Sequence, residues 1–505
     1  MKSPTWTHTI STQRMPGAAS APLSLAAEAS ILFRLAVPTF VSSLSFTALS
    51  MIEMILAGHL GTSEMTAVAF SQIIFDFTST AFTQGFNKGL SAVGSQAYGA
   101  KNYVLLGRCA QMGCVGLTVA AVPLGVCWWF VGDLLGAFGV SAASVVLAKQ
   151  YARLSVLSLW PRLMYQYLCV YFEAQQIVLP AAIISLSFVP IHVAINLLFV
   201  YGIPAWHVPG LGFVGLPLAL ACTAYTRLAV FLVYMMGYKR LHARSWHWTL
   251  DFLKTRYIAG QIRIGLPLAL GQLFEDAQLQ TMALLASTVN EISLDSHNSM
   301  LGLIFFLSSP IYGLESAGIT RIGMYLGAGR PRQAKRLAKL LTLCICGLAA
   351  IIATVLMLNR HVVGQLYSVD PLVWVAMTQI CTLAASGYVF LCVFYSSMAI
   401  LVAQTRASPI LCAFLWYIWR FTCVLVAFFI GAWLVGVPAA YVIGIVYKMG
   451  LLGIWIGMSL GYGITSLVSL RAATLSNWHD EAEKAVDRSK HKDDHKTTTD
   501  ETSLL

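Results

Sequence analysis

Two adjacent carboxylates, Glu275 and Asp276, lie inside a long apolar run that otherwise suits a membrane helix. Helical spacing places Gln272, Asp276 and Gln280 on one stripe of this run. Such a stripe fits a water-filled cavity better than lipid, because a charge at the bilayer centre costs at least about 2.5–3.5 kcal/mol. A carboxylate facing the cavity can hold either a proton or a cation. Proton release and binding of a cationic substrate would then exclude each other, which is the chemistry of an antiporter.

A second polar stripe, with Gln72, Asp76 and Thr80 at i, i+4 and i+8, predicts a cavity lining on another helix. Ordinary hydrogen bonding between membrane helices explains this stripe equally well. Glu275 and Asp276 also have an alternative, purely structural role, in which one of them forms an ion pair with Arg227 or Arg420 across the bundle.

The other charged residues within apolar runs are expected to matter less. Glu53 is predicted near the outer end of the first run, where partial hydration lowers the cost of a carboxylate. Lys88, Arg162 and Glu315 are expected near the membrane interfaces, which their long side chains reach by snorkelling.

The elements that carry these residues are membrane helices. Of 505 residues, 58% are hydrophobic and 10% are charged, and the mean hydropathy is +0.72. A soluble domain carries roughly a quarter charged residues, so the fold class is an all-α integral membrane protein. A span needs about 20 apolar residues. Twelve such runs are predicted at 31–57, 65–90, 106–131, 148–173, 179–202, 212–237, 260–288, 297–322, 337–358, 371–402, 409–434 and 445–471.

Loop charges predict the orientation of these spans. Basic residues gather in the loops at 101–108, 239–256 and 330–339, and the opposite loops hold little beyond Lys149 and Arg360. This bias places the basic loops and both termini in the cytoplasm. It also accounts for the net charge of +11, so nucleic acid is not an expected partner.

The chain repeats itself once at an offset of about 229 residues. Pro38 precedes Gly99-Ala100 as Pro267 precedes Gly327-Ala328. Because each copy has six spans, the copies form two parallel six-helix bundles related by a pseudo-twofold axis along the membrane normal. The predicted parts are a cytoplasmic segment 1–30, an N-lobe 31–237, a cytoplasmic linker 238–259, a C-lobe 260–472 and a disordered cytoplasmic tail 473–505.

Other chemistries find little support in the sequence. The eleven cysteines lie nearly all in apolar runs without a CxxC pair, so neither a disulfide nor a metal site is expected. No HExxH sequence, nucleophile elbow or His/Asp cluster indicates an enzyme. We therefore expect no catalytic residues, no metal ligands and no cofactor.

Several segments resemble the multidrug and toxic compound extrusion (MATE) family. The stretch 85–100 ends in the family's Q-A-Y-G-A motif, and 57–61 is similar to its v-G-H-L-G motif. In the second half, 265–267, 321–329 and 453–457 resemble G-L-P, R-V-x-N-x-L-G-A-G and G-L-W-x-G. The resemblance covers both lobes. It implies twelve helices around a central cleft and efflux of organic cations in exchange for inward H⁺ or Na⁺.

The resemblance also assigns positions to the acids. Counted from 265–267, Glu275 falls on the seventh-helix acid of eukaryotic members, and Glu53 falls on the first-helix Asp of many bacterial members. Gln280 stands in place of a second seventh-helix acid, and 391–397 holds no carboxylate where the family has a tenth-helix acid. Coupling would therefore rest on fewer carboxylates, such as Glu275 with Asp276, or follow a different mechanism.

The sequence predicts a secondary antiporter, present as a monomer, whose two lobes rock around a central cavity. The candidate ion-coupling or substrate-binding residues are Glu275, Asp276, Gln272, Gln280, Asp76 and Glu53. A flippase for lipid-linked or anionic substrates on a related fold is the alternative, which Arg162, Arg227 and Arg420 would suit. Residues 500–505 resemble an acidic dileucine signal. The expected location is therefore the plasma membrane or an endolysosomal or vacuolar membrane.

Overall fold

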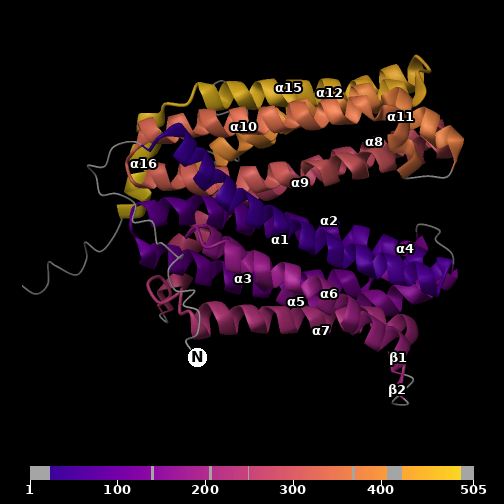
Figure 1. The fold of residues 1–505 in the computed structure, drawn as a ribbon, viewed down its shortest axis with the longest axis horizontal. Helices are drawn as coiled ribbons and strands as arrows, with labels where there is room; N and C mark the ends of the chain where they lie inside the picture. The colour runs from indigo at the N-terminus through magenta and orange to yellow at the C-terminus, as the bar shows by residue number, and fades with distance from the viewer. Residues whose placement is uncertain are drawn as a thin grey trace, which may run out of the picture.

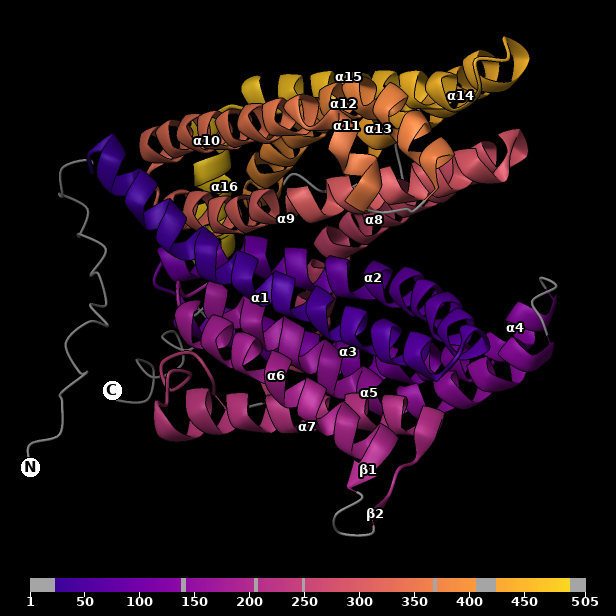
Figure 2. The same cartoon turned by 45° about the vertical axis from the view of Figure 1, so that its right-hand side comes forward.

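The helices run side by side and form two groups, with the first half of the chain in one group and the second half in the other (Figures 1 and 2). We call these groups the N-lobe, Leu25–Tyr238, and the C-lobe, Thr255–Thr474. This computed structural model describes residues 23–137, 142–203, 208–247, 250–366, 370–405 and 424–490.

The N-lobe contains six long helices. They are α1 (Leu25–Leu60), α2 (Thr62–Gly99), α3 (Tyr103–Trp129), α5 (Ala142–Glu173), α6 (Leu179–Tyr201) and α7 (Gly215–Leu232), which continues as the π-helical η4 (Val233–Tyr238). The shorter elements are α4 (Val131–Ala137), η3 (Gly212–Val214) and a two-residue antiparallel pair, β1 (Gly202–Ile203) with β2 (Val208–Pro209).

The C-lobe repeats this order. Its long helices are α8 (Thr255–Val289), α9 (Glu291–Gly327), α10 (Pro331–Leu358), α12 (Pro371–Ala403) and α15 (Gly450–Thr474). The eleventh membrane helix is described from Val424 onward and comprises α13 (Val424–Phe428), η7 (Phe429–Gly436), α14 (Val437–Tyr441) and η8 (Val442–Val446). Short elements are η5 (Leu250–Leu253) before α8, α11 (Arg360–Val363) and η6 (Gly364–Leu366), and α16 (Trp478–Lys490) follows α15.

The predicted all-α fold with two six-helix bundles is confirmed. Nine of the described helical segments are apolar enough to cross a membrane by length and composition alone. The long helices α2, α5 and α8 are not among them, and each carries a charged residue in mid-helix, Asp76, Arg162 and Glu275 respectively. Those three helices stand out because their polar side chains meet inside the protein, as described below.

The tail prediction was wrong for Trp478–Lys490, which forms the amphipathic helix α16. Trp478, Ala482 and Ala485 are spaced to share one helix face and are buried in the C-lobe core. At its far end, Ser489 accepts a hydrogen bond from Asn102 of the N-lobe (2.7 Å). The apolar stripe thus orders a segment whose overall composition is polar, and α16 contacts both lobes. Residues 491–505 lie outside the described part of the chain.

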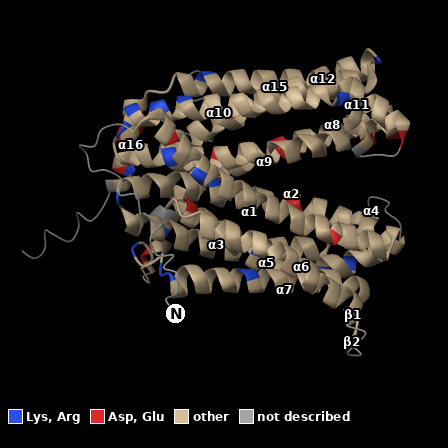
Figure 3. Ribbon diagram, viewed as in Figure 1, with Lys and Arg blue, Asp and Glu red and all other residues tan. Residues whose placement is uncertain are grey.

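Basic residues gather at the end of the molecule where α16 lies (Figure 3). This end, which we call the basic end, holds the loops after α2, α7 and α9, including Lys101, Lys239 and Arg330. The opposite end carries β1 and β2. The clustering agrees with the loop-charge pattern from which the orientation was predicted.

The two lobes touch backbone to backbone at the basic end, through a reciprocal contact. A Cβ at Gly99 of α2 would overlap the carbonyl of Met324 in α9, and a Cβ at Gly327 of α9 would overlap the carbonyl of Gln96 in α2. Each glycine thus packs against the residue three positions before the other glycine. The repeat places the same glycine at the same point of both lobes, so a crossing with pseudo-twofold symmetry needs glycine twice.

The start of α1 is fastened to the opposite lobe. The Arg321 guanidinium of α9 pairs with the Glu28 carboxylate of α1 at 3.0 Å, and Tyr325 donates a second hydrogen bond to Glu28. Both members of the ion pair are buried, so breaking it without a replacement would strand a charge in a low-dielectric site. The basic end is therefore closed by both packing and charge.

We predict that Gly327→Ala opens the basic end. The added methyl group overpacks the crossing at a cost of about 1–3 kcal/mol, which lowers the population of the closed arrangement roughly 5- to 150-fold. Distances between spin labels at Lys101 and Arg332, on the two lobes, should lengthen. Gly347→Ala in α10 is the matched control, since a Cβ there meets nothing within 4 Å. An unchanged distance distribution in Gly327→Ala would contradict the closed crossing.

Candidate functional site

A cavity of about 510 Å³ lies between the lobes. Most of its lining comes from α1, α2 and α5 of the N-lobe, and α8, α9 and α12 of the C-lobe supply the rest. Its volume is within the range of small-molecule sites, roughly 300–1,000 Å³. The charged lining residues are Asp76, Lys88, Arg162, Glu173 and Glu315.

Glu275 lies one side chain behind the cavity wall. It is 4% exposed and accepts hydrogen bonds from the Tyr395 hydroxyl (3.0 Å) and the Gln272 amide (3.2 Å). Both partners line the cavity. The Gln272 amide also donates to Asp276 (3.3 Å), so one side chain holds the adjacent acids together. The predicted polar centre on this helix is therefore present, in contact with the cavity.

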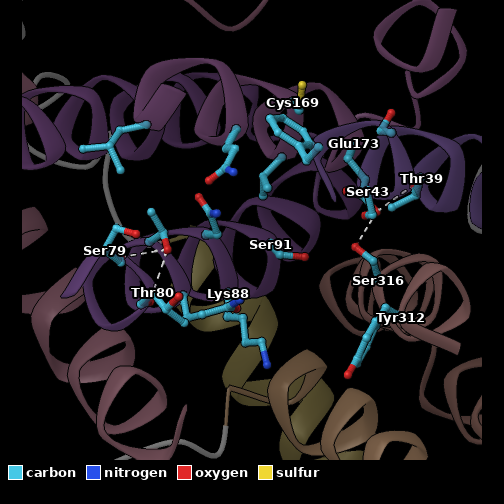
Figure 4. A pocket seen from close by; sticks show the side chains of 18 of the residues that line it. Thr39, Ser43, Ser79, Thr80, Lys88, Ser91, Cys169, Glu173, Tyr312 and Ser316 are labelled. Atoms are coloured by element: carbon cyan, nitrogen blue, oxygen red, sulfur yellow. Dashed lines mark hydrogen bonds between the residues drawn. The ribbon is translucent and has the colours of Figure 1, made fainter. Parts of the chain in front are cut away.

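A chain of hydroxyl groups continues from Glu275 along the wall. The hydroxyls of Tyr395 and Tyr312 are 3.2 Å apart, and either can be the donor. Tyr312 also lines the cavity (Figure 4). A hydroxyl group both donates and accepts. Tyr395 can therefore donate to an ionised Glu275 or accept from a protonated one.

Lys88 and Glu315 link the lobes across the cavity. The Lys88 ammonium of α2 lies 3.7 Å from the Glu315 carboxylate of α9, and their side chains are 16% and 8% exposed. Lys88 is also within electrostatic range of Glu275 and Asp276. The expectation that Lys88, Arg162 and Glu315 lie at the membrane interfaces was wrong, because all three face the cavity between the lobes.

Arg227 does not partner the acids of α8. Its guanidinium lies in the N-lobe between the rings of Phe46 and Tyr165, with centroids 4.5 and 4.3 Å away. The ion-pair alternative for Glu275 is therefore wrong with respect to Arg227, because stacking on two N-lobe rings keeps the guanidinium there. Arg420 lies outside the described residues.

The stripe predicted on α2 divides between two places. Asp76 and Thr80 line the cavity, and Asp76 is accessible from it. Gln72 turns instead to Glu53, to whose carboxylate it donates at 3.4 Å. Gln280 is exposed and does not line the cavity. The i, i+4, i+8 spacing therefore does not ensure one common environment, because neighbouring helices cover only part of each stripe.

Glu53 occupies a separate polar site inside the N-lobe. It is 2% exposed and accepts a hydrogen bond from the Tyr151 hydroxyl at 2.9 Å. It does not line the cavity. The expectation of partial hydration was wrong, because the carboxylate is buried inside the N-lobe: Tyr151 and Gln72 both donate to Oε2, and Oε1 has no hydrogen-bond partner among the described residues.

Glu173 was not recognised from the sequence. It lies at the end of α5, lines the cavity, and accepts hydrogen bonds from Ser316 of the opposite lobe (2.5 Å) and from Thr39 (3.4 Å) (Figure 4). Its position at the edge of a predicted span gave no reason to place it inside. Tyr395 was missed as well. It lies in 391–397, where the family resemblance would put an acid, and it binds Glu275 instead.

Comparisons with known proteins place the chain among transporters. The family model MatE matches residues 38–198 and 267–425, which together make up more than half of the chain and begin at the two prolines that the repeat aligns. Protein DETOXIFICATION 16 of Arabidopsis thaliana is 28% identical over 89% of each chain. Multidrug and toxin extrusion protein 1 of Danio rerio is 26% identical over 89% of this chain and 72% of its own length.

A solved structure shares the fold. The eukaryotic MATE transporter AtDTX14 superposes with a TM-score of 0.82 at 22% identity, over 92% of this chain and 99% of that chain.

We predict a measurable coupling between Lys88 and Glu315. Lys88→Met and Glu315→Gln should each lower stability by leaving a partly buried charge or acceptor unpaired. Thermal unfolding of the two variants and their combination should give a coupling free energy of about 1–3 kcal/mol. The ion pair of Lys149 and Asp133, whose side chains are 35% and 47% exposed, is the control and should give at most about 1 kcal/mol. A coupling free energy for Lys88 and Glu315 no larger than that of the control pair would contradict the prediction.

Proposed function

Because the chain belongs to the MatE family of transporters, we propose that it is a secondary antiporter that exports small organic cations in exchange for H⁺. The observation that supports this most is the position of Glu275, a buried carboxyl whose two hydrogen-bond partners, Gln272 and Tyr395, line the central cavity. A change in the charge of Glu275 therefore alters the hydrogen bonding of Gln272 and Tyr395, which lie directly on the cavity wall. Relatives named for toxin extrusion agree with this assignment.

Glu275 couples the two fluxes by holding either a proton or a negative charge. When it is ionised, Glu275 adds to the negative potential that Asp276 and Glu315 create around Lys88. A substrate cation then replaces the lost proton in balancing these acids. When Glu275 is protonated, that attraction weakens and the cation leaves. Proton and substrate thus compete without having to occupy the same atom.

The partners of Glu275 favour H⁺ over Na⁺ as the coupling ion. A sodium ion needs a shell of several oxygen ligands, whereas Tyr395 and Gln272 present hydrogen-bond donors to this carboxylate. The hydroxyl of Tyr395 can reverse its hydrogen bond and accept from a protonated Glu275 while donating to Tyr312. Reversal of the Tyr395 hydrogen bond is therefore enough to accommodate a proton on Glu275.

Transport requires the lobes to separate at the basic end and close at the other. Opening the basic end breaks the crossing of Gly99 with Gly327 and the hydrogen bond from Ser316 to Glu173. Both contacts join one lobe to the other, so rocking leaves the packing within each lobe intact. The positive-inside rule puts the basic end in the cytoplasm. As part of the same proposal, the protein works as a monomer, and its location is the plasma membrane or an endolysosomal or vacuolar membrane.

A flippase for lipid-linked anions is the less favoured alternative. Recognition of phosphate groups calls for an excess of cations. Among the described residues, the cavity lining carries three acids, Asp76, Glu173 and Glu315, against Lys88 and Arg162. This balance suits substrates with a positive charge better.

We predict that Glu275→Gln abolishes concentrative transport while the protein still folds. In proteoliposomes with an imposed pH gradient, labelled tryptamine should no longer accumulate, because an amide cannot exchange the coupling proton. Exchange of labelled for unlabelled tryptamine at equal pH should persist. Glu291→Gln, an exposed acid at the start of α9, should accumulate substrate like the unmodified protein. Normal accumulation by Glu275→Gln would refute the coupling role.

A further inference from the structure

Arg162 is a charged group of the cavity lining to which the proposed mechanism gives no role. It lies on α5 and lines the cavity, together with Gln166 one turn further on. Among the described residues it forms neither an ion pair nor a hydrogen bond, in contrast to Lys88, which pairs with Glu315. A guanidinium presents a planar fork of donors that matches a carboxylate. Arg162 therefore offers an unused anion-binding group to whatever enters the cavity.

A second guanidinium lies behind the same wall. Arg227 is 1% exposed, and its Nε and Nη1 have no hydrogen-bond partner in the described part of the chain. It stacks on Phe46, which lines the cavity, and it is within electrostatic range of Arg162. A buried charge is costly unless something of opposite sign balances it. A negative group bound at Arg162 would offset the charge of both residues.

Among the charged lining residues that the structure describes, one carboxylate and one guanidinium are left with neither an ion pair nor a hydrogen bond. Lys88 and Glu315 neutralise each other as an ion pair, and Glu173 is held by the hydroxyls of Ser316 and Thr39. Asp76 then faces Arg162 within electrostatic range, but the two do not form a direct ion pair.

A carboxylate and a guanidinium that line one cavity without forming an ion pair with each other fit a molecule that carries both charges. Its basic group would approach Asp76 and its acidic group Arg162. Resting on the proposed antiport, we propose that the preferred substrates are amphoteric, with one basic and one acidic group as in an amino acid. A purely cationic substrate would bring no acidic group to the donors of Arg162, and a purely anionic one would bring no basic group to Asp76.

Equilibrium binding of matched probes to the purified protein tests this proposal. The probes are tryptophan, tryptamine and indole-3-propionate, which share one ring and carry both charges, the basic group or the acidic group. Phenylalanine, phenethylamine and 3-phenylpropionate repeat the comparison on a smaller ring. Within at least one set, the amphoteric compound should bind about tenfold or more tightly than both relatives, the scale of a charged hydrogen bond.

Substitutions then assign each charge to its residue. Arg162→Gln should weaken tryptophan at least about tenfold more than it weakens tryptamine, whereas Asp76→Asn should weaken tryptamine more than indole-3-propionate. Arg162→Lys keeps the charge and should retain part of the preference. Arg153→Gln, on the same helix but exposed and stacked on Trp129, is the control and should bind as the unmodified protein does.

The proposal is overturned if the single-charge probes bind as tightly as the amphoteric one in both sets, or if none of the six binds. It is also overturned if Arg162→Gln weakens tryptophan and tryptamine equally. Should Arg162→Gln bind nothing, Arg162→Lys decides: a smaller preference for tryptophan over tryptamine than in the unmodified protein supports the proposal, and an undiminished preference overturns it. Binding needs no gradient, so failure of antiport with intact discrimination would refute the proposed function alone.

Discussion

The contact on which this architecture depends is the crossing of α2 and α9 at Gly99 and Gly327. Each glycine packs against the backbone of the opposite lobe, so the lobes meet at a distance that no side chain permits. The contact closes one end of the molecule and leaves the cavity beyond it. Other groups join the lobes there as well, both polar, such as the ion pair of Arg321 with Glu28, and apolar, such as Leu32 and Leu35 of α1, which pack in the C-lobe core. All these contacts lie between the lobes, so they can be made and broken while each lobe stays folded, as alternating access requires.

The cavity itself departs from the symmetry of the repeat. The lobes share their glycines and prolines, but the acids behind the wall belong to α8 and the guanidiniums to the N-lobe. The residues common to both lobes thus form the contacts that change during rocking, and the charged residues that differ between the lobes form the binding site. Lys88 connects the two, because it reaches from α2 toward Glu315, Glu275 and Asp276 on the opposite lobe.

The sequence was sufficient for the fold and for the centre of the site, but not for the partners. Hydrophobic run lengths and the repeat predicted two bundles, and helical spacing predicted that Gln272 and Asp276 share one polar stripe, where the structure shows them hydrogen-bonded. The sequence could not predict that the Tyr395 hydroxyl donates a hydrogen bond to Glu275, because the two residues come from helices distant in the sequence. Run lengths also placed Glu173 at a span boundary. Whether a polar residue meets lipid, water or a partner depends on how its helix is rotated about its own axis. Packing against neighbouring helices sets that rotation, and one sequence alone does not specify it.

The most direct test of the account is the proton balance of substrate binding. Tryptamine is added to the purified protein in weakly buffered detergent solution, and the pH change is recorded. Competition between proton and substrate at Glu275 predicts release of about one proton per bound cation at a pH where Glu275 is protonated, and no release from Glu275→Gln. Equal release from both proteins, or none from the unmodified protein at any pH where tryptamine binds, would contradict it.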